Sequence, residues 1–170
     1  MLEPFLGKSP VVAPGAWVHP SACLIGAAEI HEDASVWPGA VIRADVDRIV
    51  VGKGSNIQDL SVLHPNRNRP VLIGEGVTVG HSAIIHGSVV GGHCLIGMGA
   101  VVMDCEIGEY CLIAGGAVVT PGSRIPPRSM VMGAPGKVKR QLTDEECAGL
   151  VRSEKEYIEL TGHYRAGGAK

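Results

Sequence analysis

The chain has 170 residues, a length that suits one domain with a sizeable core. Fifteen Lys and Arg stand against seventeen Asp and Glu, a formal net charge of −2, and like charges do not gather in blocks. This near-balance disfavours a nucleic-acid partner and a membrane partner. No basic segment followed by an apolar run opens the sequence, so we expect a soluble, cytoplasmic protein.

The residue composition indicates a narrow, well-packed interior. The chain has 24 Gly and 11 Pro but only two Trp, three Tyr and one Phe, while 45% of its residues are hydrophobic. Such an interior must accept small and branched side chains rather than aromatic ones. The five cysteines match neither a disulfide framework nor a Cys-x-x-Cys metal site, so we expect reduced thiols.

Aliphatic residues recur at steps of six along most of the chain and fade near Val131. From Ile73 to Val90 and from Val90 to Ile107 the step is seventeen residues, which is the length of one full repeat. Three aliphatics per repeat predict a triangular prism of parallel coils, each with three short strands that stack in register on the next coil. The triplets are Val12, Val18 and Leu24; Ile30, Val36 and Ile42; Val51, Ile57 and Leu63; Ile73, Val79 and Ile85; Val90, Ile96 and Val102; and Ile107, Ile113 and Val119.

Glycines and two insertions punctuate the repeat. A Gly follows the leading aliphatic at Gly74, Gly91 and Gly108, which suits a corner where the backbone turns tightly. Longer connections interrupt the coil at residues 43–50 and 64–72. Insertions in a solenoid fall in loops on one edge and often carry function, so we expect two loops there.

A helix is predicted after the prism. Thr143 and Glu146 have the spacing of a capping box, and an apolar stripe follows them. We therefore expect a β-helix over residues 1–140, a C-terminal helix over 141–164 that packs on the prism, and a tail over 165–170. The stripe consists of Cys147, Leu150, Val151, Tyr157 and Ile158; Tyr164 lies near the end of the helix, where its position relative to a pocket stays open.

Two of the seven histidines share a column of the prism. His64 and His86 each follow the third aliphatic of their coil, on adjacent coils. Stacked strands lie about 4.8 Å apart, and two imidazole nitrogens on one tetrahedral zinc ion lie roughly 3 Å apart. A small convergence of the side chains would therefore let both bind one ion. A lone His on a turn is usually solvated, and we expect His19, His31, His93 and His163 to be surface residues of this kind.

A third histidine stands on a different face. His81 lies five residues before His86 and around a corner, so we expect it not to reach the same ion within one chain. A subunit related by threefold symmetry could present its own His81 to His64 and His86. Three His with an open fourth position form the catalytic type of zinc site. Stacked histidines also suit a polar ladder at an interface, and both interpretations remain open at this point.

The spacing His64-x16-His81-x4-His86 on a hexapeptide prism resembles that of the γ-class carbonic anhydrases, over nearly the whole chain. The resemblance implies an all-β fold, a left-handed parallel β-helix with a C-terminal α-helix. Periodicity does not set this hand, and the general crossover rule favours the opposite one. The resemblance also implies a homotrimer with Zn²⁺, or alternatively Fe²⁺ or Co²⁺, held by His64, His81 and His86 at each subunit interface.

Two further motifs carry the resemblance. Arg43-x-Asp45 is similar to the family's Arg-x-Asp, an ion pair at the trimer interface, and Asn56-x-Gln58-Asp59 is similar to its Asn-x-Gln-Asp. The resemblance implies that Gln58 contacts the zinc-bound water or bicarbonate and that Asp59 joins the interface network. All five residues are therefore candidate catalytic residues. For Arg43, Asp45 and Asp59 the alternative is an interface salt bridge without a catalytic role.

The implied activity is the reversible hydration of CO₂ to bicarbonate, because zinc held by three neutral imidazoles lowers the pKa of bound water to about 7. The chain departs from the family prototype in having Val46 after Asp45 and no acidic residue in loop 64–70. It is more similar to a shorter subclass that includes ferripyochelin-binding, carnitine-operon and phenylacetate-degradation homologues. Without a glutamate to export the proton, we expect buffer to replace that step.

Two other functions stay open. One is a trimeric scaffold that binds a metal or bicarbonate with little turnover, which the missing proton-shuttling glutamate favours. The other is an acyltransferase or acyl-CoA thioesterase, since many hexapeptide prisms transfer acyl groups and Gly133-Ala134-Pro135 resembles a terminal motif of such enzymes. Three converging histidines disfavour acyl transfer, which needs one catalytic His, and the fold alone does not decide between them.

Overall fold

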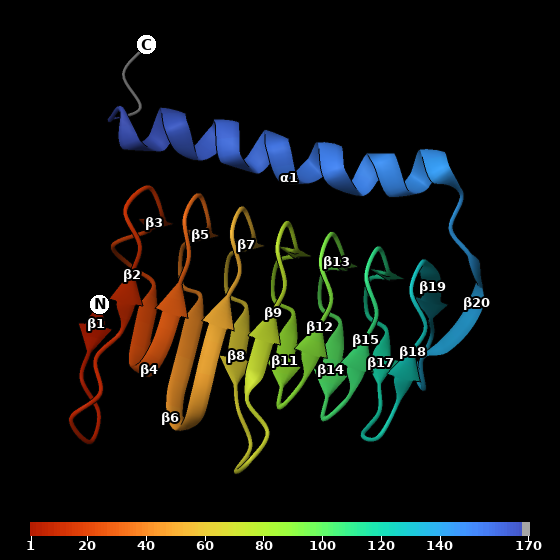
Figure 1. The fold of residues 1–170 in the computed structure, drawn as a ribbon, viewed down its shortest axis with the longest axis horizontal. Helices are drawn as coiled ribbons and strands as arrows, with labels where there is room; N and C mark the ends of the chain where they lie inside the picture. The colour runs from red at the N-terminus through yellow and green to blue at the C-terminus, as the bar shows by residue number, and fades with distance from the viewer. Residues whose placement is uncertain (168–170) are drawn as a thin grey trace.

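Short strands wind into a parallel solenoid of about seven turns, and a single helix runs back along it (Figure 1). The structure is a computed structural model and describes residues 1–167. Most strands have two or three residues, as the hexad pattern predicts. The first ten strands are β1 Leu2–Glu3, β2 Val11–Val12, β3 Trp17–Val18, β4 Cys23–Ile30, β5 Ser35–Val36, β6 Val41–Val51, β7 Asn56–Ile57, β8 Val62–His64, β9 Val71–Ile73 and β10 Thr78–Val79.

The later strands repeat the pattern of the earlier ones until the last strand, which pairs antiparallel. They are β11 Ile84–His86, β12 Val89–Val90, β13 Leu95–Ile96, β14 Val101–Met103, β15 Glu106–Ile107, β16 Leu112–Ile113, β17 Val118–Val119, β18 Arg124–Ile125, β19 Ser129–Met132 and β20 Lys137–Gln141, followed by α1 Asp144–Arg165.

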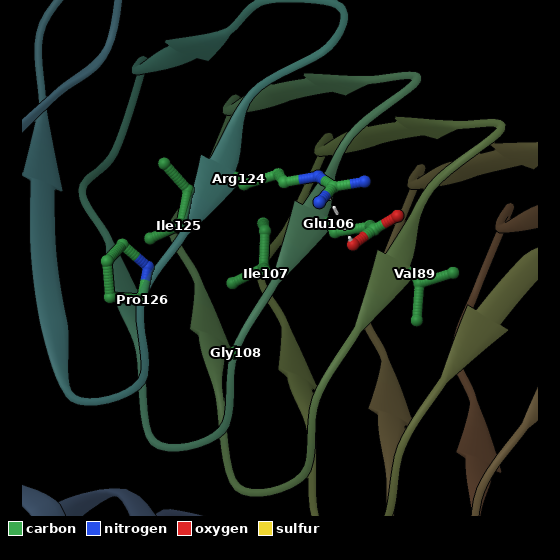
Figure 2. A pocket seen from close by; sticks show the side chains of 7 residues that line it. All are labelled: Val89, Glu106, Ile107, Gly108, Arg124, Ile125 and Pro126. Atoms are coloured by element: carbon green, nitrogen blue, oxygen red, sulfur yellow. Dashed lines mark ion pairs between the residues drawn. The ribbon is translucent and has the colours of Figure 1, made fainter.

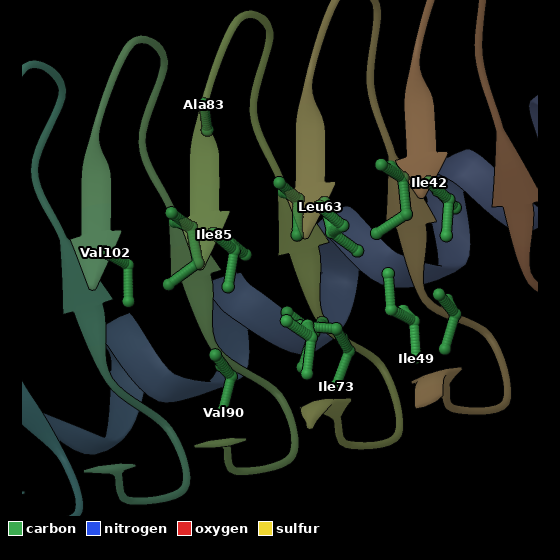
Figure 3. Close-up of a cluster of buried hydrophobic side chains, with 14 of the residues drawn as sticks. Ile42, Ile49, Leu63, Ile73, Ala83, Ile85, Val90 and Val102 are labelled. Atoms are coloured by element: carbon green, nitrogen blue, oxygen red, sulfur yellow. The ribbon is translucent and has the colours of Figure 1, made fainter. Parts of the chain in front are cut away.

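Equivalent strands of successive coils pair in register, so the predicted columns are confirmed. Leu63 in β8 pairs with Ile85 in β11, and Ile85 pairs with Val102 in β14. These side chains point into the prism and form a continuous row through its core (Figure 3). The strands form two sheets. The first has the order β17-β14-β11-β8-β6-β9-β12-β15-β18, with β4 paired to β6, and β1 and β2 paired to β4. The second has the order β20-β19-β16-β13-β10-β7-β5-β3.

Of the two predicted loops only the second is a loop. Residues 43–50 belong instead to the continuous strand β6, which pairs with β4 and links two faces of the prism. The expectation failed because both ends of the insertion pair with β4, Ala44 with Gly26 and Ile49 with Ala28. The ladder shifts register between these two pairs, so residues 45–48 have no partner in it. Residues 65–70 do form a loop, closed by a bridge between Asn66 and Arg69.

Small residues at the corners tie one coil to the next. A Cβ built on Gly91 would lie 2.6 Å from the backbone nitrogen of Glu109, so this corner admits only glycine without displacement. Ser55 donates its hydroxyl to the carbonyl of Gly74 at 2.8 Å and accepts from the amide of Val77 at 2.9 Å. All five cysteines are free.

The C-terminal segment differs from the prediction in one respect. The predicted prism runs to residue 140, whereas β20 leaves the coil and pairs antiparallel with β19, with exposed side chains that include three charged residues. Charged side chains on a terminal strand discourage further strand pairing. α1 then begins at the predicted cap, where Glu146 donates its amide to Thr143 at 3.2 Å, and a hydrogen bond from Arg140 lowers the pKa of Glu146 to about 2.

Helix α1 docks on the prism through a polar pair and an aromatic cluster. His93 places Nδ1 3.1 Å from the Glu154 carboxylate and stacks on Tyr110, so its prediction as a solvated residue is wrong. The reason is that α1 covers this turn, which the repeat pattern does not reveal. Tyr164 packs between Trp17 and Trp37, with ring centroids at 5.2 and 5.3 Å. Residues 168–170 of the predicted tail lie outside the described residues, and Arg165 belongs to α1.

No helix among residues 1–167 combines the length and the apolar character needed to cross a membrane. Helix α1 carries charged residues on its outer side. Only a few of its residues are buried, among them Cys147, Leu150 and Thr161. Its hydrophobic contacts are therefore with the prism.

Replacing Ile85 by Ala should destabilise the protein by about 2–5 kcal/mol, because a fully buried side chain between Leu63 and Val102 leaves a cavity that the rigid coils cannot close. Chemical denaturation measures the change. Val89→Ala is the matched control, since Val89 is an exposed aliphatic on the neighbouring strand β12. Equal losses for the two variants would contradict the packing described.

Candidate functional site

His64 and His86 lie side by side on the outer surface of the prism. They pair directly in the register of β8 and β11, and their ring centroids are 5.2 Å apart. Both side chains are partly buried. The shared column predicted from the spacing is therefore confirmed, and two imidazoles are available on one face.

An ion pair supports His64. Arg43 and Asp45 alternate along β6, and the Arg43 guanidinium donates to Asp45 Oδ2. The other carboxylate oxygen lies 3.0 Å from His64 Nε2. Burial raises the pKa of Asp45, but the hydrogen bonds from Arg43 and His64 outweigh it and hold that pKa below its usual value. In this arrangement His64 keeps Nδ1 open.

His81 occupies the corner after β10, away from the other two histidines. Its Nδ1 lies 2.9 Å from Asp59 Oδ2. Asp59 stands on the preceding coil at the position equivalent to His81. A carboxylate at Nδ1 fixes the ring and leaves Nε2 free for a ligand. Asp59 thus orients His81 within a single chain.

A buried chain of amides holds Gln58. The Asn56 amide donates to the Thr78 hydroxyl at 3.0 Å, and the Gln58 amide donates to the Asn56 carbonyl oxygen at 3.0 Å. Gln58 also lines a cavity of about 390 Å³ between α1 and the prism, together with Met98 and Tyr157. Burial raises the pKa of Tyr157, and the Asp59 carboxylate adds to the effect.

The three histidines do not form a metal site within one chain. Over the part of the chain that the structure describes, no three His, Cys, Asp or Glu side chains gather closely enough to hold an ion. His64 and His86 are neighbours, and His81 does not join them. A site built from all three needs a second chain, so the shared site stays a prediction.

One residue of this region was not predicted from the sequence. Asp104 follows Met103, which pairs with His86, and its carboxylate Oδ1 lies 3.9 Å from His86 Nδ1. Its position could have indicated it, because Asp104 stands on the coil after His86, one residue beyond the column that His64 and His86 share. No family motif pointed to it.

A second hollow of about 390 Å³ lies along β12, β15 and β18, and no predicted site residue lines it (Figure 2). Its ion pair, between Arg124 Nε and Glu106 Oε2 at 3.8 Å, is exposed on both sides. A surface pair of this kind contributes little energy. This hollow therefore adds nothing to the histidine site.

Comparison with known proteins decides the family. Carbonic anhydrase from Geobacillus kaustophilus is 41% identical over 167 residues, covering 98% of this chain and 92% of that protein. The chain belongs to the γ-carbonic anhydrase family. Mitochondrial gamma carbonic anhydrase 2 of Arabidopsis thaliana is 41% identical over 160 residues, which are 90% of this chain and 58% of that protein. Carnitine operon protein CaiE of Escherichia coli is 39% identical over 163 residues, covering 95% and 83%.

Solved structures confirm the left-handed parallel β-helix for this γ-carbonic anhydrase family member. A hexapeptide transferase family protein from Anaplasma phagocytophilum aligns with a TM-score of 0.92 and 38% identity, covering 96% of this chain and 97% of that one. A candidate acetyltransferase from Bacillus cereus aligns with a TM-score of 0.95 and 34% identity, covering 97% and 96%. No family model matches the chain.

Replacing Asn56 by Ala should release the Gln58 amide and strand the Thr78 hydroxyl, at a cost of about 1–3 kcal/mol. In ¹⁵N-labelled protein the Gln58 side-chain amide protons should exchange slowly with water in the wild type and quickly in the variant. Thr78→Val is the control, since it removes the hydroxyl that accepts from Asn56 but keeps the hydrogen bond between Gln58 and Asn56. Unchanged exchange in Asn56→Ala would show that the amide chain does not hold Gln58.

Proposed function

We propose that this protein is a homotrimer that binds zinc between His64 and His86 of one subunit and His81 of the next, and that it catalyses the reversible hydration of CO₂. The observation that carries the proposal is the division of the three histidines within one chain. Two stand in register on one face, and the third is oriented by Asp59 on a separate corner with Nε2 open. Threefold symmetry supplies the missing ligand without any change in the prism.

The residues present fit a metal ion. Three imidazoles are suitable zinc ligands, and metal-bound histidines usually carry a carboxylate or carbonyl at the other ring nitrogen. Here Asp45, Asp59 and Asp104 each face one of the three rings. Asp104 Oδ1 is moreover a buried oxygen without a hydrogen-bond partner in residues 1–167, as expected where a ring is still to be turned toward it. Zinc, ferrous iron and cobalt all accept such a ligand set.

Exposed aliphatic side chains around the histidines support assembly. Ile84 is 42% exposed and precedes His86 by two residues in β11, so both point out of the same face. Leu60 and Met98 are each 65% exposed, on turns that follow β7 and β13. Apolar side chains that gather beside a polar cluster indicate an interaction surface. A second copy of the chain fits it best, because the third histidine must come from there.

Each supporting residue has a role in the proposed reaction. A zinc ion held by His64, His86 and the neighbouring subunit's His81 would lower the pKa of bound water to about 7 and so would supply the nucleophile near neutral pH. Gln58 has its amide nitrogen committed to Asn56, so its carbonyl oxygen is the group left to accept a hydrogen bond from substrate or water. Arg43 holds Asp45 against His64 and thereby positions the ring.

Acyl transfer is the second candidate, because the solved structures that align over the whole chain include a hexapeptide transferase and a candidate acetyltransferase. An assay for acetyl-CoA hydrolysis and transfer to amines tests it directly. A metal- or bicarbonate-binding scaffold without turnover would bind zinc but hydrate no CO₂.

The cytoplasmic location and the lack of nucleic-acid or membrane partners remain predictions from charge and composition.

Replacing His81 by Ala should abolish metal binding while leaving the circular dichroism spectrum and the prism unchanged, since His81 lies on a turn and fills no core position. Metal analysis of purified protein measures the loss. A His64→Ala/His86→Ala double variant should also bind no metal. When the two variants are mixed and reassembled, about one quarter of the interfaces in a random trimer would carry all three ligands. Recovery of metal near that fraction supports the shared site, whereas a monomer or no recovery would refute it.

The CO₂ hydration rate should rise with buffer concentration, because loop 64–70 carries Arg67 and Arg69 but no carboxylate that could pass a proton to solvent. Stopped-flow measurement of the zinc- or iron-loaded trimer, prepared anaerobically, gives the rate. A glutamate introduced as Asn68→Glu should reduce the buffer dependence, and Asn68→Gln is its matched control. A wild-type CO₂ hydration rate that does not change with buffer concentration would contradict the prediction.

A further inference from the structure

All three candidate ligands face a carboxylate on a neighbouring coil. Asp45 lies 3.0 Å from His64, Asp59 lies 2.9 Å from His81, and Asp104 lies 3.9 Å from His86. The first two carboxylates belong to the motifs already discussed. The third has no role in them, and it lies beside the remaining ring on the coil after His86, whereas Asp45 and Asp59 lie on the coil before their histidines.

We propose that Asp104 is a positioning residue that holds His86 with Nε2 turned toward the metal, by accepting a hydrogen bond from its Nδ1. The proposal rests on the proposed metal site. It adds the third member of a set in which every ligand has its own carboxylate. Such partners fix the ring and raise its basicity as a ligand.

The backbone fixes Asp104 beside His86. Met103 pairs with His86 in the parallel ladder, and the amide of Asp104 donates to the His86 carbonyl at 2.8 Å. Oδ1 of Asp104 is buried and has no hydrogen-bond partner among residues 1–167. A buried carboxylate oxygen without a donor is costly. At 3.9 Å the His86 Nδ1 is too far for a hydrogen bond, and a modest turn of the ring would close the gap.

Gly87 makes room for this carboxylate. A Cβ built on Gly87 would lie 2.3 Å from Asp104 Oδ1, and the residue has a φ of +52°. Any side chain at position 87 would therefore push the carboxylate away from the ring, in addition to straining the backbone. The residue that follows the candidate ligand is thus the one that admits its partner.

Asp104 has two simpler possible roles, binding Arg69 and adopting the turn conformation, and neither requires its carboxylate. Arg69 donates to the main-chain carbonyl of Asp104 at 3.2 Å rather than to its side chain. Asp104 also has a φ of +44°, a conformation that Asp and Asn tolerate better than other residues with side chains. Asn would satisfy that turn equally well, so the two explanations predict different outcomes for Asp104→Asn.

The test compares zinc affinity of the wild-type trimer, Asp104→Asn and Asp33→Asn by competition with a chelator. Asp33 is the matched control, another Asp with positive φ, +56°, that contacts none of the three histidines. Asp104→Asn should lose 10–100-fold in affinity and Asp33→Asn should lose none, with unchanged circular dichroism for both. Equal affinity of Asp104→Asn and wild type would overturn the proposal.

A second readout follows the ring itself. With ¹⁵N-labelled histidine, His86 in the zinc-loaded wild type should show a slowly exchanging Nδ1 proton, and Asp104→Asn should lose that slow exchange. A rapidly exchanging proton in the wild type would count against the hydrogen bond. If the wild-type trimer binds no zinc, the proposed function fails and this inference falls with it. If it binds zinc and Asp104→Asn binds equally well, only the inference fails.

Discussion

Parallel, in-register stacking of the coils is the constraint on which the rest of the structure depends. Strands within the coil pair with their equivalents one coil before and one coil after, so a residue lies next to its counterpart between seventeen and twenty-two positions away. Strand spacing is about 4.8 Å for every such pair. The core therefore consists of straight rows of aliphatics, and a residue that did not fit its row would disturb two neighbours.

The same stacking builds the candidate site. His64 and His86 face each other because their strands pair, and each histidine meets an aspartate that stands near the corresponding place on an adjacent coil. His64 and His86 stand on paired strands, whereas Asp59, His81 and Asp104 stand on the turns and bends that follow strands. Stacked coils thus carry every residue of the site, which suits a constellation that must hold an ion.

The repeat, the core rows and the histidine column could be predicted from the sequence because each depends only on spacing. What could not be predicted depends on contacts between segments that do not share the repeat. Helix α1 covers His93, and pairing of both ends of residues 43–50 with β4 makes a predicted loop part of β6. Asp104 escaped notice because an aspartate at a corner is common, and only the unpartnered oxygen beside His86 distinguishes it.

Dividing the ligands between two subunits would couple metal binding to assembly in the proposed trimer. An ion that binds only the assembled form stabilises it by mass action. Ile84, Leu60 and Met98 would contribute apolar contact independently of the ion. Two of the carboxylates have a further role here: Asp45 and Asp59 orient His64 and His81 from within their own chain, so that two subunits bring together ligands already directed. Less side-chain freedom is then lost when the ion binds, which is the advantage of preorganisation.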